Sequence, residues 1–481
     1  MLISVFLLIF SGYIEKYSRS LVALLLYSSL KQLIARVNQS LLLSGDQLKR
    51  FTSYRHTEYG LIVSSTILGM AVGGAIVVFH LVVSFFEGQF DTFFLAANTH
   101  DILRYVYFPF IVAAGGLIVG ILNKTLFRNV KDEGLPSVVE AVKHGGVLIR
   151  KRSSLKAIFT AAFSIGSGGG AGREAPTILL GASVGSTIGQ ALRLRSDQLR
   201  ILGAAGAAAA ISGIFNAPLG GIVFAIETII GEVSVEAFVP LVIASVMATA
   251  TSRLFLGDSP ILIAPPTQIV EVRDYFLLAA AGISSGGIAL YYLKTYNWCF
   301  EKTKDLLKNV PDYLRPAIGG LAQGVLVALL PTMLETTYDP INLAIAGSGA
   351  LLVAAISVLV KPFSAAITLG SGGAGGTFAP ALKIGALFGF TFGFLLKLLI
   401  PSTSPGLYAL VSTGAVLAGC YRMPLTGAIL VFEICRNYNL ILPLMFGAIF
   451  SAFIVQRSKV RTFNPLDTQL VVDRQHDPDS K

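Results

Sequence analysis

The sequence Gly166-Ser-Gly-Gly-Gly-Ala-Gly-Arg-Glu-Ala-Pro176 returns 204 residues later as Gly370-Ser-Gly-Gly-Ala-Gly-Gly-Thr-Phe-Ala-Pro380. Seven of the eleven positions are identical, and apolar segments flank both copies. So many glycines make a poor helix, whereas Pro176 and Pro380 suit the first turn of one. Each copy therefore predicts an irregular backbone that leads into a helix start, where free N–H groups and the positive end of the helix dipole bind anions.

Composition places the chain in the membrane class. It is 54% hydrophobic and 13% charged, with a mean hydropathy of +0.71, which is unlike a soluble domain of this length. Long apolar runs alternate with shorter ones that Gly or Pro interrupts, so we expect an all-α polytopic membrane protein with many short, tilted, interrupted helices. The three cysteines and five histidines show no metal-ligand spacing, so no metal or other cofactor is predicted.

The net charge of +10 is attributed to basic cytoplasmic loops. No basic run is interleaved with aromatic residues, so nucleic acid is not an expected partner. Residues 1–55 are expected to form an N-terminal amphipathic or cytoplasmic region, because their charges follow the first apolar patch instead of preceding it as in a signal peptide. Residues 56–465 are the expected transmembrane domain, and residues 466–481 a short polar cytoplasmic tail.

A second repeat divides the transmembrane domain in two. Pro218-Leu-Gly-Gly-Ile-Val-Phe-Ala-Ile-Glu227 is echoed 206 residues later by Pro424-Leu-Thr-Gly-Ala-Ile-Leu-Val-Phe-Glu433, which predicts structural halves at about 56–255 and 256–465. Basic residues flank the first glycine phrase, whereas residues 317–360, before the second, contain no Lys or Arg. The positive-inside rule then predicts that the halves are inverted, with both glycine phrases facing one central site.

Glu174 is the main candidate for chemistry. The amides of Arg173, Glu174 and Ala175 are predicted to line an anion site, and a carboxylate at this depth is costly unless it is paired or functional. It would compete with an anion for the amides, and protonation would release it. Two alternatives are a salt bridge between Glu174 and a buried arginine, and glycines that serve close helix packing alone. Arg173 is expected to anchor the loop. A soluble phosphate-binding loop lacks its Gly-Lys-Ser/Thr ending here.

Four motifs in order resemble the CLC family of chloride channels and proton-coupled chloride exchangers, in its prokaryotic type without CBS domains. They are Gly-Arg-Glu-Ala-Pro (172–176), Asn-Ala-Pro-Leu-Gly-Gly (216–221), Gly-Gly-Thr-Phe-Ala-Pro (375–380) and Pro-Leu-Thr-Gly through Asn-Tyr-Asn-Leu-Ile-Leu-Pro (424–443). The resemblance implies the CLC fold, a homodimer with one pore per subunit, chloride and protons as partners, and a bacterial inner membrane.

The same resemblance assigns roles to single residues. Glu174 matches the family's gating glutamate, and Thr377 and Phe378 match the residues whose amides hold the central anion. Tyr438 matches the tyrosine whose hydroxyl contacts that anion from the inner side. Glu133 and Gly134 match the inner filter, where the family usually has Gly-Ser-Gly-Ile-Pro and this chain has Asp132-Glu-Gly-Leu-Pro136. A carboxylate at Glu133 would repel chloride unless it is protonated or turned away.

Further departures concern the proton path and the outer site. Thr228, directly after Glu227, stands where proton-coupled members often carry a second glutamate, so Thr228, Glu227 and Glu232 are candidates for an inner proton path, with Glu236 a further substitute. Two other departures from the usual pattern are Ala175, which replaces a glycine, and Lys383, which either raises the potential for anions or pairs with a nearby acid.

The expected function is chloride transport by Cl⁻/H⁺ antiport, and the chain is not expected to be an enzyme. The alternative on the same scaffold is a passive, voltage- or pH-gated chloride channel. A membrane enzyme acting on a phosphorylated substrate would need a nucleophile, a base or a metal cluster near the glycine phrases, and the sequence offers none there.

Overall fold

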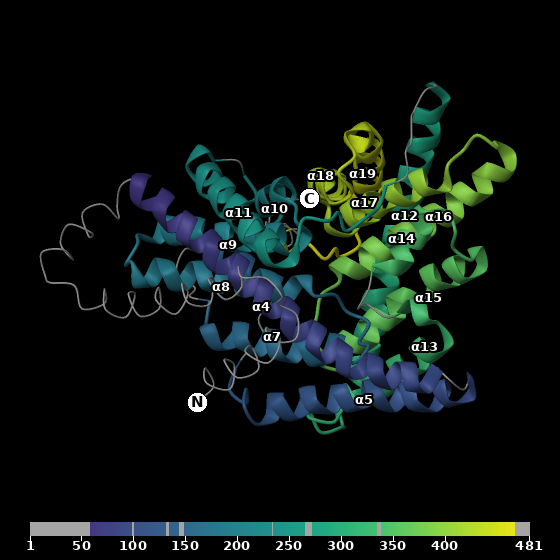
Figure 1. Ribbon diagram of the computed structural model, residues 1–481, viewed down its shortest axis with the longest axis horizontal. Coiled ribbons are helices and arrows are strands. Elements are labelled where there is room, and N and C mark those ends of the chain that lie inside the picture. The colour runs from purple at the N-terminus through teal and green to yellow at the C-terminus, as the bar shows by residue number, and fades with distance from the viewer. Residues whose placement is uncertain are drawn as a thin grey trace, which may run out of the picture. The chain divides into compact units, whose positions relative to one another are not determined.

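The computed structural model describes residues 58–98, 101–130, 134–143, 149–232, 234–264, 272–333 and 338–466. The predicted N-terminal region 1–55, the tail beyond residue 466 and Glu133 lie outside these ranges. Within them, every regular element is a helix, as the sequence predicted (Figure 1). The elements in chain order are α4 (Glu58–Asn98), α5 (Asp101–Lys124), α6 (Leu135–Lys143), α7 (Lys151–Gly166), α8 (Glu174–Ala191), α9 (Ser196–Phe215), α10 (Pro218–Phe224), η1 (Ala225–Ile230), α11 (Val235–Leu256), α12 (Val272–Leu307), α13 (Arg315–Leu329), η2 (Pro331–Met333), α14 (Asp339–Ile345), α15 (Leu351–Gly370), α16 (Phe378–Leu399), α17 (Pro405–Tyr421), α18 (Pro424–Cys435), η3 (Tyr438–Leu440) and α19 (Ile441–Gln456).

Long and short helices are mixed, which confirms the expected multipass membrane protein. In the described residues, eight helices are long and apolar enough to cross a bilayer. Shorter apolar helices accompany them, including one at Pro218–Ile230 that joins α10 to the π-helix η1. Such a helix is about 20 Å long and cannot span about 30 Å of hydrocarbon alone. The chain is therefore an integral membrane protein in which several helices end at membrane depth.

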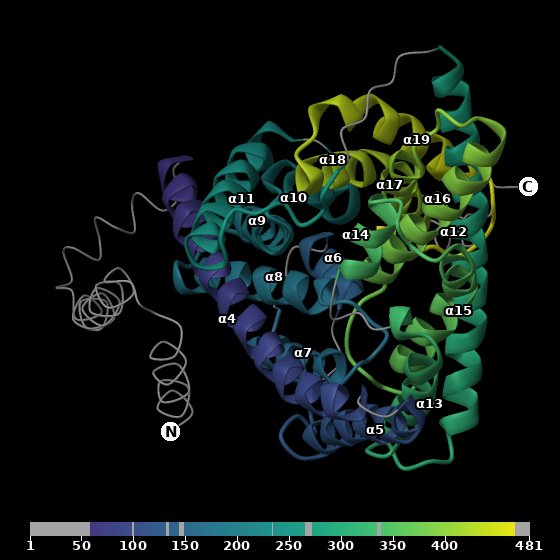
Figure 2. The same cartoon turned by 45° about the vertical axis from the view of Figure 1, so that its right-hand side comes forward.

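The two halves contact each other through equivalent residues. Helices α5 and α13 lie side by side (Figures 1 and 2). A methyl group on Gly320 of α13 would lie 2.5 Å from the Val112 carbonyl oxygen of α5, and one on Gly116 of α5 would collide with the Pro316 carbonyl of α13. Because 316 and 320 follow 112 and 116 by 204 residues, each contact is the reverse of the other. Such reciprocity is what an internal two-fold axis between inverted halves produces.

Small residues form the centre of the unit that runs from Leu61 onward. Helix α9 is buried from Leu202 to Ser212, mostly as Ala and Gly, and α17 is buried along its whole length. A helix that is apolar all round belongs inside a protein. Helix α8 packs on α9 and α16 packs on α17, so this small-residue core supports the two helices that follow the glycine phrases.

Candidate functional site

The two glycine phrases pair directly, backbone to backbone. Gly172 N donates to the Gly376 carbonyl at 2.8 Å, and Gly376 N donates to the Gly172 carbonyl at 2.7 Å. Gly375 has a φ of +148°, and a methyl group there would lie 2.5 Å from the Ala171 Cβ, so only glycine fits. The pairing brings the starts of α8 and α16 together.

Each phrase is also held by a hydroxyl group from the other half. Gly170 N donates to Thr368 Oγ1 on α15 at 3.0 Å, and Ala374 N donates to Ser164 Oγ on α7 at 3.2 Å. The two hydroxyl residues, Ser164 and Thr368, are 204 residues apart, and so are the two amides that they bind. A small cavity beside these bonds is lined by the hydroxyl-bearing residues and glycines of both halves, including Ser164, Ser167, Thr368 and Ser371. The irregular backbone is thus satisfied inside the protein, as membrane depth requires.

Glu174 is the first residue of α8 and is fully buried. Its Oε2 accepts a hydrogen bond from Ala379 N, in the first turn of α16, at 3.3 Å. The carboxylate of one half therefore lies at the helix start of the other, where N–H groups and two helix dipoles stabilise negative charge. An external anion would bind to the same donors.

The Arg173 side chain points to a different element. Its Nη2 lies 3.3 Å from Glu87 Oε1 in an ion pair, and its Nη1 lies 3.5 Å from His80 Nδ1. Both partners belong to α4. The guanidinium therefore ties the glycine loop to α4, in the anchoring role expected from the sequence, and the Arg173 amide role at the anion site stays a prediction.

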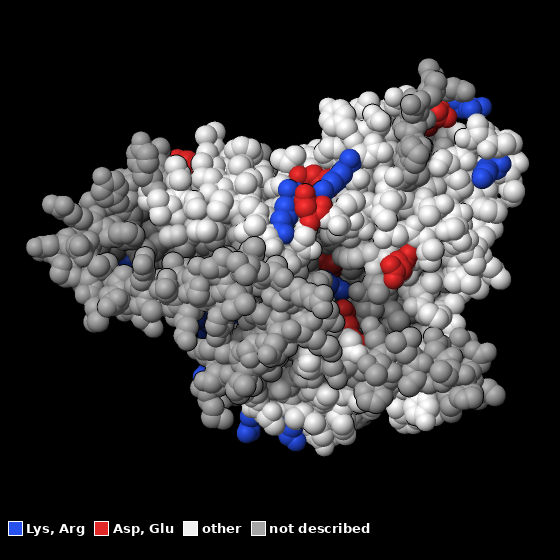
Figure 3. Space-filling view, viewed as in Figure 1, with Lys and Arg blue, Asp and Glu red and all other residues white. Residues whose placement is uncertain are grey.

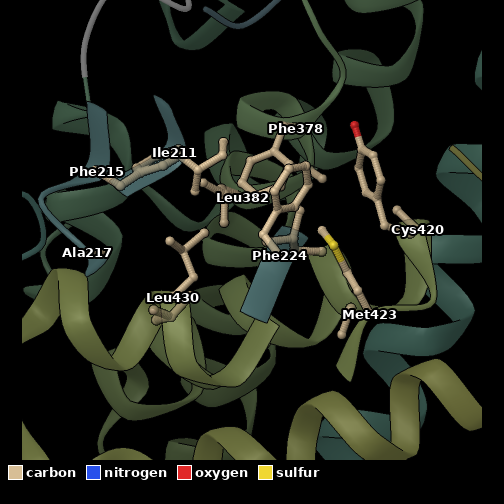
Figure 4. Close-up of a cluster of buried hydrophobic side chains, with 14 of the residues drawn as sticks. Ile211, Phe215, Ala217, Phe224, Phe378, Leu382, Cys420, Met423 and Leu430 are labelled. Carbon is tan, nitrogen blue, oxygen red and sulfur yellow. The ribbon is translucent and has the colours of Figure 1, made fainter. Parts of the chain in front are cut away.

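Thr377 and Phe378 lie where α16 begins. Thr377 Oγ1 is 2.7 Å from Tyr421 Oη, and Tyr292 Oη donates to the Thr377 carbonyl at 3.3 Å. Phe378 is buried against Phe215, whose ring centroid is 5.7 Å away. Figure 4 shows Phe378 facing a wall of apolar side chains from several helices, with Phe215, Phe224, Leu382 and Met423 among them. This wall excludes water from one side of the helix starts.

Tyr421 is the tyrosine that the structure places at this site, and the sequence analysis missed it. It ends α17, it is buried, and its ring packs 5.6 Å from that of Phe378. Its sequence context, at the end of an apolar helix before Arg422-Met-Pro, carries no chemical pattern that would single it out. By contrast, Tyr438 is 75% exposed and its ring contacts Phe432 at 6.0 Å. The described contacts do not bring Tyr438 to Glu174, and its anion role stays a prediction.

The predicted inner residues are dispersed. Thr228 is fully buried, with Oγ1 3.4 Å from Met423 Sδ. The Glu227 carboxylate binds the start of α18, whereas Glu232 and Glu236 are exposed. The Gly134 carbonyl accepts the first-turn hydrogen bond of α6 from Val138 N; Glu133 lies outside the described residues.

Two further predicted residues flank the helix starts. Ala175 lies in the first turn of α8, where a methyl group on Gly376 would be 2.9 Å from its Cβ. Lys383 is 1% exposed in α16, one turn after Ala379, and helical side chains lean toward the N-terminus. Ala175 is therefore next to the paired glycine phrases, and Lys383 is buried one turn inside α16; the roles of both at the anion site stay predictions.

Comparisons with known proteins agree with this architecture. Residues 115–456 match the family described as "Voltage gated chloride channel". The chain is 31% identical over 345 residues to a "Putative chloride channel protein ClcB-like" of Ralstonia nicotianae, covering 70% of this chain and 79% of that protein. It is 29% identical over 444 residues to the "H(+)/Cl(-) exchange transporter ClcA" of Vibrio vulnificus, covering 88% and 92%.

Solved structures share the fold. A slow cyanobacterial Cl⁻/H⁺ antiporter superposes with a TM-score of 0.75 at 24% identity, covering 88% of this chain and 99% of that one. A CLC-type fluoride/proton antiporter gives a TM-score of 0.67 at 21% identity, covering 82% and 95%. At these identities the likeness establishes the architecture of inverted, interrupted helices.

Proposed function

The chain belongs to the voltage gated chloride channel family, and from that premise we propose that it exchanges chloride for protons across a bacterial inner membrane, with Glu174 as the gate. The exchange activity named for its relative from Vibrio vulnificus supports the proposal. The observation that carries it is the hydrogen bond from Ala379 N to Glu174 Oε2, which joins the two halves at their helix starts.

The mechanism follows from competition for the same donors. When Glu174 is ionised, its carboxylate occupies the positive start of α16 and excludes a second anion. Protonation removes the charge, so the helix start no longer holds the side chain strongly and chloride takes its place. The carboxyl group must give up its proton before the carboxylate can return and expel chloride. If the proton leaves toward the membrane side opposite to the one that supplied it, and chloride leaves toward the supplying side, the two ions move in opposite directions. The apolar wall around Phe378 limits proton leakage by excluding water.

The proposed anion donors are the amides at both helix starts: Ala175 in α8, and Thr377, Phe378 and Ala379 in α16. The Thr377 hydroxyl adds a donor whose direction is set by Tyr421, 2.7 Å away. If Tyr421 donates to Thr377 Oγ1, the threonine proton is free to point at the ion. This arrangement supplies hydrogen bonds from backbone amides and one hydroxyl group to a desolvated anion.

Flux through proteoliposomes tests the proposal. With a chloride gradient and a pH electrode, the wild-type protein is expected to drive protons uphill, and Glu174→Ala is expected to retain chloride flux and lose proton movement. The exposed Glu140 of α6 provides a matched control, since Glu140→Ala should leave both fluxes unchanged. Proton pumping that survives in Glu174→Ala would refute the gate assignment.

A passive chloride channel is the second candidate, and Thr228 is the observation that favours it. This buried residue carries a hydroxyl where an inner proton acceptor would require a carboxylate, and its described partner is Met423 Sδ. A channel would show chloride flux in the same assay with no proton movement at any gradient. Thr228→Glu would then still move no protons, whereas in an exchanger it should raise the proton flux.

We also propose that a second copy of the chain covers the face formed by α10, α11, α18 and α19. Large apolar side chains are exposed along this face, among them Leu219, Phe238, Leu425 and Leu442. Glu227 of η1 and Glu433 of α18 are only partly buried at this face, and partly buried carboxylates at membrane depth favour a protein partner over lipid.

Disulfide cross-linking tests this arrangement, since the native cysteines are buried. A cysteine in place of Leu425 should cross-link two copies in membranes, whereas one in place of the exposed Leu352 on α15 should not. Equal cross-linking at both positions, or a monomer by light scattering in mild detergent, would refute the proposed dimer face.

A further inference from the structure

The second repeat also forms a reciprocal contact, distinct from the anion site. The Glu227 carboxylate accepts hydrogen bonds from Leu425 N at 3.0 Å, Thr426 N at 2.7 Å and Thr426 Oγ1 at 2.6 Å. Leu425 and Thr426 are in the first turn of α18. A carboxylate from the first half therefore caps the start of a helix in the second half.

The reverse bond is present as well. Glu433 Oε2, near the end of α18, accepts from Gly220 N in the first turn of α10 at 2.7 Å. Because 426 and 433 follow 220 and 227 by 206 residues, the two caps are equivalent under the repeat. They are separated by seven residues along the helix, about 10 Å. We call this pair the cross-caps: Glu227 on α18 and Glu433 on α10.

Local sequence explains why the caps come from the other half. The N-cap residues are Ala217 for α10 and Met423 for α18, and neither side chain makes a capping hydrogen bond to its own helix. The N–H groups of the first turn lack helical acceptors and need partners when they lie at membrane depth. Carboxylates supply charge-assisted bonds at the positive ends of the helices.

The surroundings of the two caps differ. Arg253, at the end of α11, acts electrostatically on Glu433 and lies 3.0 Å from Asp258. Asp258 also accepts from Arg436, directly after α18. Figure 3 shows acidic and basic side chains gathered over α10 and α18 on this face. Near Glu227 the arrangement is different. Arg422, directly after α17, donates to the Ser458 carbonyl at 3.2 Å, and the described partners of Glu227 are Leu425 and Thr426.

Glu227 also lies in an unusual backbone. Residues Ala225–Ile230 form a π-helix, whereas the equivalent end of α18 stays α-helical through Cys435. A π-turn widens the helix and redirects the side chains that follow, and such turns are frequent at functional sites. Here the widening coincides with the residue that reaches the start of α18.

We propose that the cross-caps are two titratable sites that hold α10 and α18 in register, and that protonation of each carboxylate loosens the pair and accelerates anion flux independently of Glu174. A protonated carboxyl group loses the charge that the helix start attracts, so the bond to the amides weakens to that of a neutral pair. The functional half of this inference rests on the proposed chloride transport.

The transport test uses Glu174→Ala as background, because its chloride flux no longer reports on the gate. That flux is expected to rise as pH falls, by about fivefold for each cap that is neutralised. Glu227→Gln and Glu433→Gln imitate the protonated caps and keep an acceptor oxygen. Each should raise the flux at neutral pH and reduce its pH dependence, and both together should leave the flux fast at every pH.

The exposed acids Glu140 and Glu301 supply matched controls, because Gln at either position should leave the pH profile unchanged. A flat profile in Glu174→Ala, or an unchanged profile after both cap substitutions, would overturn the inference. Hydrogen exchange separates this failure from failure of the proposed function, since it needs no transport. Glu227→Gln should speed amide exchange at the start of α18 alone, and Glu433→Gln at the start of α10 alone; unchanged exchange in both would show that the carboxylates do not cap.

Discussion

Replacing Glu174 tests whether its carboxylate and chloride occupy the same donors. In Glu174→Ala the Ala379 N–H loses its acceptor, and a buried donor without a partner costs about 1–3 kcal/mol. Glu174→Gln keeps an acceptor oxygen beside Ala379 N, so its loss of unfolding free energy should be about half as large. Chloride can replace the missing oxygen, and a ligand at 100 times its Kd adds about 2.7 kcal/mol of stability.

The assay is thermal unfolding in detergent, with chloride titrated against gluconate. Without chloride, the midpoints should rank wild type highest, Glu174→Gln next and Glu174→Ala lowest. Chloride should raise the midpoint of Glu174→Ala most, because no carboxylate competes, and that of wild type least. Equal chloride-dependent shifts in wild type and Glu174→Ala would refute the shared site, whatever the ranking without chloride.

Four other substitutions have defined outcomes. Gly375→Ala should cost about 1–3 kcal/mol through overpacking against Ala171 and abolish chloride flux, whereas Gly287→Ala, where a methyl group meets open space, should be silent in thermal unfolding. Tyr421→Phe should weaken chloride binding about tenfold by calorimetry, because Thr377 Oγ1 loses its partner; unchanged binding would remove Tyr421 from the site. Thr368→Ala should destabilise the protein by about 1–3 kcal/mol and lower its chloride affinity, because the Gly170 N–H loses its acceptor. The control Thr413→Ala should keep the chloride affinity, because the Thr413 hydroxyl bonds within its own helix. The hydrogen bond from Arg436, with Asn216 and Arg253 nearby, holds the pKa of Asp258 below its usual range. Its stabilising effect is therefore complete above the unfolded pKa of about 3.9 and lost as pH falls through the folded pKa. Asp258→Asn should lower the unfolding midpoint at pH 7, and this difference from wild type should shrink as pH falls below about 3.9.

The glycine phrases predicted the centre of the fold because their chemistry is local. A run of glycines ending in Pro fixes where a helix can start, and repetition with opposite flanking charge indicates inverted copies that face each other. The backbone pairing of Gly172 with Gly376 is the contact between the two copies. The anchoring role of Arg173 was also predicted from its position in the glycine phrase, whereas its partner Glu87, 86 residues earlier, was not predicted.

Contacts between distant residues of ordinary type could not be predicted. Tyr421 reaches Thr377 across 44 residues, and Glu227 reaches Thr426 across 199. Glu227 was considered for a proton path because of its neighbour Thr228. Its capping contact arises instead because the N-cap residues Ala217 and Met423 make no side-chain capping bond to α10 and α18. The lack of a side-chain cap can be recognised in the sequence only once the helix boundaries are known. The exposure of Tyr438 is likewise a property of the packing of η3 and not of its motif.

The internal two-fold axis creates an electrostatic problem that the Glu174 carboxylate relieves. It brings the positive ends of α8 and α16 together at membrane depth, where water does not screen them. The repeat is strict for the Gly172–Gly376 bonds and for the cross-caps, yet it breaks at Glu174, whose equivalent is Phe378. One carboxylate therefore serves two helix ends, and the Phe378 side closes the site with apolar surface. A site with neither carboxylate nor chloride would leave both helix ends uncompensated. If Glu174 is the gate as proposed, its carboxylate is also the counterion of both helix ends, and transport and folding stability should change together when Glu174 is replaced.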